Sequence, residues 1–477
     1  MNRAADEHPR GNDPAFPALH VRPRTGWVND PNGLFRWRGR YHVFFQHNPH
    51  APVHADICWG HASSVDLAHW QMHPAALVPT PGGPDSAGCW SGCVVDDDGT
   101  ATAVYTGAAT GPHTATVCLA YAQDDGLRTW RKDPTPAAAP PPDLELLGWR
   151  DPFLFTHGGR RYALIGAGLV PRGAPTALLY ACDALREWSY LGPLVDSADP
   201  VAAAHAPADI WECPALARLG DRWVLIVSLW TAGTLGRAAY LVGDLVDDDA
   251  GNPRFRPAGG GLVDSGHDFY APALLREDGR VLLWGWSWED RADGDVLAAD
   301  WAGSLTLPRD LRLTRDERLV STPAPEVSLL RTTPATATVS VGGDSDPLVD
   351  LGAGPWDIEA VVRWVEAGPT TLVVHLGSSG LRLTLDPSDG RATLERSVHD
   401  PRRAHWPTEG RCGYGGRSAR VRVVIDGSLV EVYGADGPVY TERVYPGSAA
   451  TTSIGVTGPP GARVDLRVWR LAPTSPS

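Results

Sequence analysis

A tryptophan motif that recurs at nearly constant spacing is the feature that most constrains this fold. The segments DLAHW, DGLRTW and DALREW end at Trp70, Trp130 and Trp188, which are 60 and 58 residues apart. Each copy follows an apolar run and precedes a stretch rich in proline or glycine. A unit of this length holds about four short strands, which is the content of one blade of a β-propeller. The spacing therefore predicts a propeller.

The rest of the sequence favours strands throughout. Helical periodicity is nearly absent, and short apolar runs are instead bounded by Gly, Pro, Asn and Asp. Examples of these runs are Tyr41–Phe45, Ala101–Tyr105, Arg161–Ile165, Trp223–Val227 and Val281–Trp284. With 52 glycines and 43 prolines available for turns, we predict an all-β protein.

The organisation along the chain predicts two domains. Residues 16–325 have room for five blades, so we expect a five-bladed β-propeller there. Residues 326–340 contain much Pro and Thr and are interpreted as a linker. Residues 341–473 contain a second set of segments in which apolar and polar residues alternate. One of them, Val421–Tyr433, is predicted to form two strands around an Asp-Gly turn. This pattern predicts a C-terminal β-sandwich, in which we find no candidate catalytic cluster.

The composition excludes several classes of partner. A net charge of -14 argues against nucleic acid or an anionic membrane surface. No apolar run approaches the ~18 residues of a membrane helix, and the first twenty residues lack the apolar core of a secretory signal. We therefore expect a cytoplasmic protein. The seven cysteines, at 58, 89, 93, 118, 182, 213 and 412, are expected to be reduced core thiols.

Three acidic residues share one local pattern. Asp30 in WVNDPNG, Asp151 in GWRDPFLF and Glu212 in IWECPALARL each follow a tryptophan and precede a proline and a strand. Taken singly, each fits a turn or a surface ion pair. Loops that recur at the same position of successive blades, however, bring their side chains to one place. Carboxylates beside aromatic rings are what the hydrolysis of a sugar acetal requires.

The motifs WVNDPNG, FFQHNP, WGHA, WSG, WRDPF, ECP and GHDFYAP occur in this order. Together they closely resemble the β-fructofuranosidases of glycoside hydrolase family 32, from about Leu19 to Trp469. That family contains invertases, fructan exohydrolases and sucrose-6-phosphate hydrolases. The resemblance implies a five-bladed propeller followed by a β-sandwich.

The resemblance also implies roles. Asp30 matches the nucleophile, Glu212 the acid/base and Asp151 the stabiliser of the transition state. Since the family is retaining, we expect Asp30 and Glu212 to lie about 5–5.5 Å apart. We also expect Arg150 to hold Asp151 ionised. The implied fructose-binding positions are Asn29, Gln46, Trp59, Trp90, Ser91 and Arg150, with Asp268, Tyr270 and Trp288 at the rim or in a second layer.

Some positions depart from the family pattern. Cys93 stands where serine is frequent, Ala215 where aspartate is frequent and Trp90 where phenylalanine is common. None of these removes a reacting group. The histidines at 42, 47, 50 and 54 lack a matching carboxylate motif, so we expect no metal and no other cofactor.

The expected function is the hydrolysis of sucrose to glucose and fructose through a covalent fructosyl-enzyme intermediate. The alternatives are an exo-fructanase or fructooligosaccharide hydrolase, a sucrose-6-phosphate hydrolase, a transfructosylase and a non-catalytic carbohydrate-binding propeller. The expected partner is a small sugar, and the sequence carries no signal for an oligomeric state.

Overall fold

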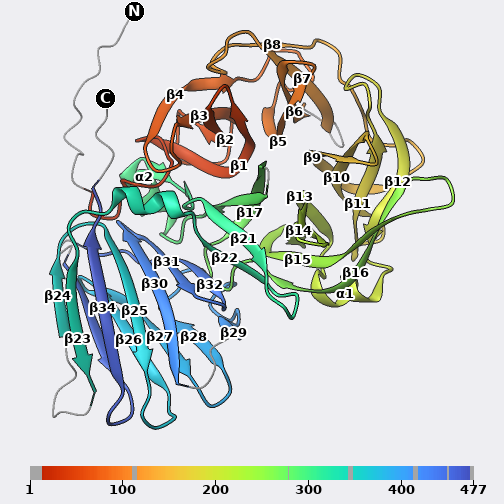
Figure 1. Cartoon of the computed structure of the whole chain (residues 1–477). Helices are drawn as coiled ribbons and strands as arrows, with labels where there is room; N and C mark the ends of the chain where they lie inside the picture. Colours follow the sequence, from red (N-terminus) through yellow and green to blue (C-terminus); the bar gives the residue numbers. More distant parts are fainter. Residues whose placement is uncertain are drawn as a thin grey trace, which may run out of the picture. The chain divides into compact units, whose positions relative to one another are not determined.

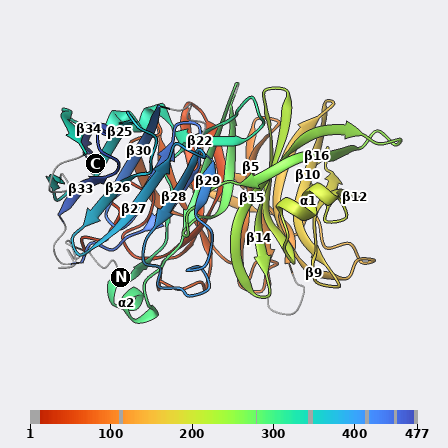
Figure 2. The ribbon, with the colours of Figure 1, turned by 90° about the horizontal axis from the view of Figure 1, so that it is seen from below.

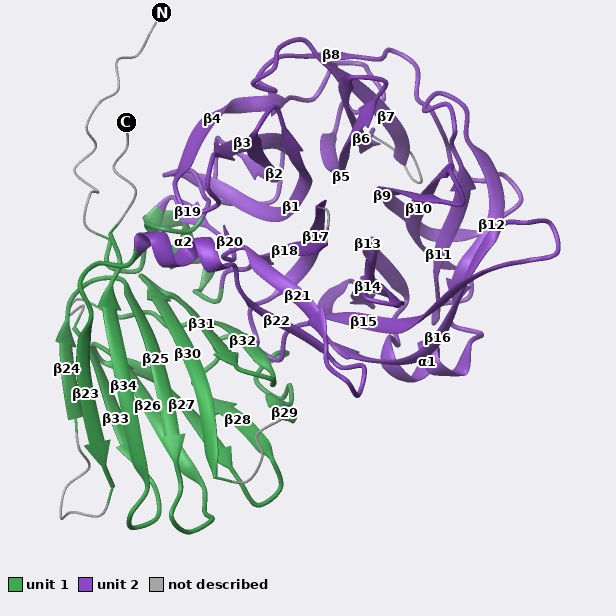
Figure 3. Ribbon diagram, viewed as in Figure 1, with its two compact units in different colours: residues 1–20, 290–299, 331–473 green, residues 21–289, 300–330, 474–477 purple. Residues whose placement is uncertain are grey.

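The computed structural model describes residues 13–109, 115–277, 279–341, 348–411, 417–447 and 451–472. Cys412 lies outside these residues. The chain divides into two compact units (Figure 3). We call residues 21–289 and 300–330 the propeller unit, and residues 1–20, 290–299 and 331–473 the sandwich unit.

The propeller unit consists of five sheets. In each sheet, strands that follow one another along the chain pair side by side, because two- to few-residue turns connect antiparallel strands most simply. The first sheet contains β1 (Gly26–Trp37), β2 (Arg40–Asn48), β3 (Cys58–Ser64), β4 (Trp70–Leu77) and β19 (Trp301–Ala302). The second and third contain β5 (Gly88–Asp97), β6 (Thr100–Ala108), β7 (Ala115–Ala122), β8 (Trp130–Lys132), then β9 (Leu146–His157), β10 (Arg160–Leu169), β11 (Ala174–Ala181) and β12 (Ser189–Asp196).

The fourth sheet contains β13 (Ile210–Leu219), β14 (Arg222–Thr231), β15 (Thr234–Asp247) and β16 (Pro253–Leu262). A short helix, α1 (Pro200–His205), lies against β16 (Figure 2). The fifth sheet contains β17 (Tyr270–Glu277), β18 (Arg280–Ser287), β20 (Ser304–Leu305), β21 (Arg309–Leu313) and β22 (Leu319–Pro323). A short 3₁₀ helix, η1 (Pro325–Leu330), follows it.

The first strand of each sheet is its innermost strand, and these strands form a closed ring. Strand β1 contacts β5, β5 contacts β9, β9 contacts β13, β13 contacts β17, and β17 contacts β1 again (Figure 1). Apolar side chains fill the space between neighbouring sheets. The prediction of a five-bladed β-propeller is confirmed.

One short segment joins the last blade to the first. Trp301 and Ala302 pair in parallel with Gly26 and Trp27 of β1, while Ser304 and Leu305 pair with β18 of the fifth blade. The ring is therefore closed by backbone hydrogen bonds as well as by packing.

The repeated tryptophan motif is the turn between the third and fourth strands of the first three blades. In each copy the indole N–H donates to the carbonyl of the leucine three residues earlier, at 3.1 Å for Trp70, 3.0 Å for Trp130 and 2.9 Å for Trp188. That leucine is buried in all three copies. The motif therefore closes the turn and anchors it in the core, which explains why its spacing equals the blade length.

The sandwich unit consists of two six-stranded antiparallel sheets. Their facing side chains form one apolar core, because alternate residues of each strand point inward. The first sheet contains β23 (Ala335–Ser340), β34 (Arg463–Arg470), β25 (Trp356–Arg363), β30 (Ser418–Asp426), β31 (Leu429–Gly434) and β32 (Val439–Arg443). The second contains β24 (Leu348–Gly352), β33 (Thr452–Thr457), β26 (Thr370–Leu376), β27 (Ser379–Asp386), β28 (Arg391–Glu395) and β29 (Glu409–Arg411). The predicted β-sandwich is confirmed.

The residue boundaries of the domains remain a prediction. Within the interval 326–340 that we interpreted as a linker, most of η1 and the whole of β23 are found. No helix among the described residues is long and apolar enough to cross a membrane.

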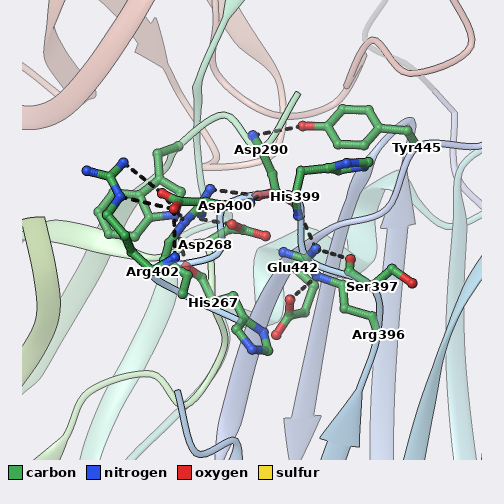
Figure 4. A network of polar contacts seen from close by, with 12 residues as sticks. His267, Asp268, Asp290, Arg396, Ser397, His399, Asp400, Arg402, Glu442 and Tyr445 are labelled. Atoms are coloured by element: carbon green, nitrogen blue, oxygen red, sulfur yellow. Dashed lines mark hydrogen bonds and ion pairs between the residues drawn. The ribbon is translucent and has the colours of Figure 1, made fainter. Parts of the chain in front are cut away.

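Buried ion pairs attach segments distant in sequence to the sandwich sheets. Asp290 accepts hydrogen bonds from Arg396 Nη1 at 2.9 Å and from the backbone N–H of His399 at 3.1 Å (Figure 4). Its own backbone N–H donates to the hydroxyl of Tyr445 at 3.1 Å. Arg396 also pairs with Glu442. The segment that contains Asp290 is thereby held by the loop after β28.

The chain's N-terminal segment is held in the same unit by His20. Its Nδ1 lies 2.8 Å from Asp426 and its Nε2 lies 2.9 Å from Glu431. Burial alone would lower the pKa of His20, but the two carboxylates outweigh it and raise the pKa to about 9. The imidazolium therefore bridges two buried carboxylates.

The sign of the pKa shift predicts how stability varies with pH. Since the pKa of His20 is raised on folding, its stabilisation is complete below about 6.5 and disappears as the pH rises through about 9. Replacement of His20 by Gln should lower the free energy of unfolding at pH 6 by about 3–5 kcal/mol, because two buried carboxylates lose their counter-ion. Denaturant unfolding from pH 6 to 10 should show this difference shrinking.

The matched control is His405→Gln, which changes an exposed histidine of the same unit and should alter stability little at any pH. A difference between wild type and His20→Gln that stays constant up to pH 10 would contradict the proposed charge on His20.

Candidate active site

Each inner strand of the propeller loses its pairing register at a corresponding place. The breaks lie between Val28 and Pro31 in β1, Cys89 and Gly92 in β5, Arg150 and Phe153 in β9, Glu212 and Ala215 in β13, and Tyr270 and Ala273 in β17. A break of this kind re-aims the side chains next to it. Because the five strands surround one axis, the re-aimed side chains converge there.

Proline explains four of the five breaks. The pairs are Asp30-Pro31, Asp151-Pro152, Cys213-Pro214 and Ala271-Pro272. Proline has no N–H, so the hydrogen-bond ladder stops at each of them. Asp151, Cys213 and Ala271 also have positive φ angles of 64°, 47° and 46°. Such backbone conformations cost on the order of 1–3 kcal/mol each and persist only where neighbouring groups hold them.

Cys213 lies between two of the three predicted acids. Its Sγ is 3.6 Å from Asp30 Oδ2 and 3.5 Å from Asp151 Oδ2, and its backbone N–H donates to Asp151 Oδ2 at 2.9 Å. Glu212 is the preceding residue. The structure therefore brings together Asp30, Asp151 and Glu212 from the first, third and fourth blades, as the sequence pattern predicted.

Asp30 is surrounded by hydrogen-bond donors. Its Oδ2 accepts from Ser91 Oγ at 2.7 Å and from Gln46 Nε2 at 3.0 Å, and its Oδ1 accepts from Asn29 Nδ2 at 3.2 Å. Burial and the charge of Glu212 nevertheless raise the pKa of Asp30 to about 6, against the opposing effect of Ser91 and Asn29. Asp30 is thus charged at neutral pH and has donors that orient both of its oxygens.

Glu212 is held by two residues. Arg150 donates from Nε and Nη2 to Glu212 Oε1 at 2.8 and 2.6 Å, and the hydroxyl of Tyr270 donates to Oε2 at 2.5 Å. The ring of Trp288 stacks on Tyr270 with centroids 5.4 Å apart. Both oxygens of Glu212 are therefore held in place. The ring of Trp288 packs against Tyr270, which donates to one of them.

Asp151 differs from our expectation. Arg150 is hydrogen-bonded to Glu212, and its charge only partly opposes the effect of burial on Asp151. Burial, with the charges of Glu212 and Asp30, raises the pKa of Asp151 to about 7. Arg150 lowers the pKa of Asp151, as expected, but by less than burial raises it, because the guanidinium is hydrogen-bonded to Glu212.

Two of the remaining predicted residues have no exposed surface. Trp59 and Asp268 are fully buried, at 0% exposure each. The indole N–H of Trp59 donates to the carbonyl of Trp90 at 2.9 Å, and that of Trp288 lies 3.2 Å from Asp268 Oδ1. In this structure Trp59 and Asp268 support other site residues, and direct contact of either with a sugar stays a prediction.

Several residues near the three acids were not predicted. His54 has its ring 6.2 Å from that of Trp27 and 6.5 Å from that of Trp90, and Trp27 packs edge-on against Trp286 at 5.6 Å. Thr106 accepts the backbone N–H of Asp151 at 2.8 Å. Cys213 could have been found from the sequence, since it precedes Pro214 as Asp30 precedes Pro31 and Asp151 precedes Pro152.

This arrangement suits acid-assisted displacement at a sugar carbon. Asp30 accepts hydrogen bonds from several donors, and Glu212 is held by its own donors. Asp151 lies near both of these acids. Two carboxyl groups are sufficient for glycoside hydrolysis. Among the described residues, no group of three or more His, Cys, Asp and Glu side chains is arranged to hold a metal ion.

Comparisons with known proteins identify a family of similar chains. Residues 20–323 match the model of the glycosyl hydrolases family 32 N-terminal domain, and residues 326–470 match that of the glycosyl hydrolases family 32 C terminal. A raffinose invertase of Escherichia coli is 32% identical over 466 residues, covering 90% of each chain. A sucrose-6-phosphate hydrolase of Bacillus subtilis is 31% identical over 480 residues, covering 96% of this chain and 95% of the relative.

Solved structures show the same fold. A family 32 β-fructofuranosidase of Bombyx mori superposes with a TM-score of 0.81 at 25% identity, covering 99% of this chain and 97% of that one. A sucrose-6-phosphate hydrolase of Lactobacillus gasseri gives a TM-score of 0.80 at 23% identity, with 98% and 95% covered. Together with the family models, these similarities show that the chain belongs to glycoside hydrolase family 32 and is a glycoside hydrolase.

Proposed function

We propose that this protein is a retaining, exo-acting β-fructosidase that hydrolyses sucrose to glucose and fructose. The observation that carries the proposal is the convergence of Asp30, Asp151 and Glu212 on one place, with Cys213 in contact with two of them. Relatives at 30% identity or more are named raffinose invertase and sucrose-6-phosphate hydrolase, which supports a fructosyl-containing substrate.

The first chemical step forms a bond between the enzyme and the sugar. An oxygen of Asp30 attacks C2 of the fructosyl unit, while Glu212 gives its proton to the departing glycosidic oxygen. The C2–O bond breaks with its electrons moving to the leaving glucose, which departs as the neutral sugar. Asp30 is suited to the attack because Ser91, Gln46 and Asn29 orient its oxygens.

The second step reverses the roles of acid and base. Glu212, now deprotonated, removes a proton from water, and the resulting hydroxyl attacks C2 and releases Asp30. Two displacements at one carbon give net retention, which requires Asp30 and Glu212 about 5–5.5 Å apart. Asp151, whose pKa is raised to about 7, binds fructosyl hydroxyls. In its ionised form, Asp151 also stabilises the positive charge that develops on the sugar ring.

Sucrose 6-phosphate is the second candidate substrate, because many of the relatives bear that name. A phosphate on the glucosyl unit would need a cation beyond the fructosyl site. Arg150, the guanidinium placed at the three acids, already donates to Glu212 through two nitrogens. A phosphate would therefore need a cation other than Arg150.

A cytoplasmic location is part of the proposal. The six cysteines in the described part of the chain are free, which suits a reducing compartment. Small imported sugars, with sucrose first among them, are the substrates that such a location provides.

Substitution of either reacting acid tests the assignment of roles. Asp30→Asn and Glu212→Gln should each lower kcat on sucrose by several orders of magnitude while leaving the melting temperature close to that of the wild type. The matched control is Asp143→Asn, which removes an exposed carboxylate and should leave kcat unchanged. Near-normal turnover in either active-site variant would show that its role is misassigned.

The dependence of activity on pH tests whether Asp30 must be ionised. Because a nucleophile must be ionised, kcat/KM should decrease as the pH is lowered through about 6, the pKa of Asp30. Ser91→Ala removes a donor to the charged carboxylate, so the acid limb of the profile should move to higher pH by about one half to one pH unit. An acid limb that moves to lower pH in Ser91→Ala would refute this electrostatic account.

A substrate panel tests specificity. Values of kcat/KM on sucrose, sucrose 6-phosphate, kestose and inulin should be highest for sucrose, and concentrated sucrose should release fructose and glucose in equal amounts. A preference for sucrose 6-phosphate or kestose would select that alternative. A deficit of fructose would indicate transfer to sugar, and absence of turnover would leave a binding protein.

A further inference from the structure

We infer that Thr106, in the second blade, is a positioning residue for the acid groups of the third and fourth blades. The inference rests on the proposed function, because it assigns to Thr106 an effect on the reaction that Asp151 and Glu212 serve. Thr106 lies on β6, which contacts β9, the strand of Asp151. It does not itself touch the reacting atoms.

The first contact is between Thr106 and the backbone of Asp151. The N–H of Asp151 donates to Thr106 Oγ1 at 2.8 Å, and both residues are buried, at 1% and 5% exposure. Asp151 lies inside the register break of β9, between Arg150, which pairs with Gly166, and Phe153, which pairs with Leu164. The threonine hydroxyl thus takes the place of the strand partner that the break removes.

Because of the backbone conformation of Asp151, this contact affects where its carboxylate points. Its φ angle of 64° is unusual for a residue other than glycine, and it determines where the carboxylate points. A buried N–H without a partner is strongly disfavoured, so loss of the acceptor would favour backbone conformations that find another. The carboxylate of Asp151 would then move with its backbone.

A second contact transmits the position of Asp151 to the fourth blade. The side chain of Asp151 accepts the backbone N–H of Cys213 at 2.9 Å, and Cys213 also has a positive φ angle, of 47°. Cys213 directly follows Glu212. The hydroxyl of Thr106 in the second blade thus orients the backbone of Asp151 in the third. The carboxylate of Asp151 in turn orients the backbone of Cys213, next to the proposed acid/base.

A merely structural threonine would contribute through packing alone. Valine has nearly the same shape as threonine but no hydroxyl, and serine keeps the hydroxyl but loses the methyl group. Thr102 provides the matched control: it lies on the same strand, is fully buried, and its hydroxyl donates to the carbonyl of Thr100 at 3.2 Å, within its own strand.

The experiment compares Thr106→Val, Thr106→Ser and Thr102→Val. We expect Thr106→Val to lower kcat on sucrose on the order of 100-fold with KM changed less than threefold, since small misplacements of reacting groups reduce rates by that order. Thr106→Ser should restore kcat to within about threefold of wild type, and Thr102→Val should leave it within about twofold. If Thr106→Val matches Thr102→Val, or if Thr106→Ser is as impaired as Thr106→Val, the inference is overturned.

A measurement independent of activity separates this inference from the proposed function. Hydrogen–deuterium exchange of peptides containing Asp151 and Cys213 should be faster in Thr106→Val than in the wild type and unchanged in Thr102→Val. Unchanged exchange at both amides overturns the positioning role. If wild type hydrolyses no fructoside, the proposed function fails, and the exchange data still decide whether Thr106 holds the two peptides.

Discussion

The active site depends on the interruption of the inner β-strands by proline. An uninterrupted strand would point alternate side chains into the sheets on either side of it, and its backbone groups would all be paired. At Asp30-Pro31, Asp151-Pro152 and Cys213-Pro214 the ladder stops, and the adjacent acid is directed towards the axis of the ring. The same chemistry that marks a turn in the sequence therefore produces a convergent site once five blades close around an axis.

The charged groups of this site are mostly acidic. Three acids lie together, and among the residues placed there Arg150 is the cation. Burial raises the pKa values of Asp30 and Asp151 towards neutrality, while donors such as Ser91 oppose the effect for Asp30. Groups that titrate close to neutral pH and differ in their partners can take different roles in proton transfer and attack. The geometry therefore separates three chemically similar side chains into three environments.

Much of the fold and of the candidate site could be predicted from the sequence, because the motifs that mark them are local. The tryptophan motif marks one turn of each of the first three blades, and the tryptophan–acid–proline pattern marks the register breaks. Which partner each group has could not be predicted, since it depends on contacts between blades. Arg150 adjoins Asp151 in sequence but donates to Glu212, and Thr106 lies in an ordinary apolar strand. The attachment of His20 to Asp426 and Glu431 joins residues more than 400 positions apart and has no local signature.

The central claim is that Asp30 forms a covalent bond to the fructosyl unit while Glu212 transfers the proton. Its most direct test is to incubate Glu212→Gln with an activated fructosyl donor whose leaving group needs no protonation, and to analyse the protein by mass spectrometry. The first step can then proceed, while the second lacks its base, so the intermediate should accumulate. The account predicts a mass gain of one fructosyl residue, located on the peptide that contains Asp30. Accumulation on another residue, or turnover of the donor with no covalent species even under rapid quenching, would contradict it.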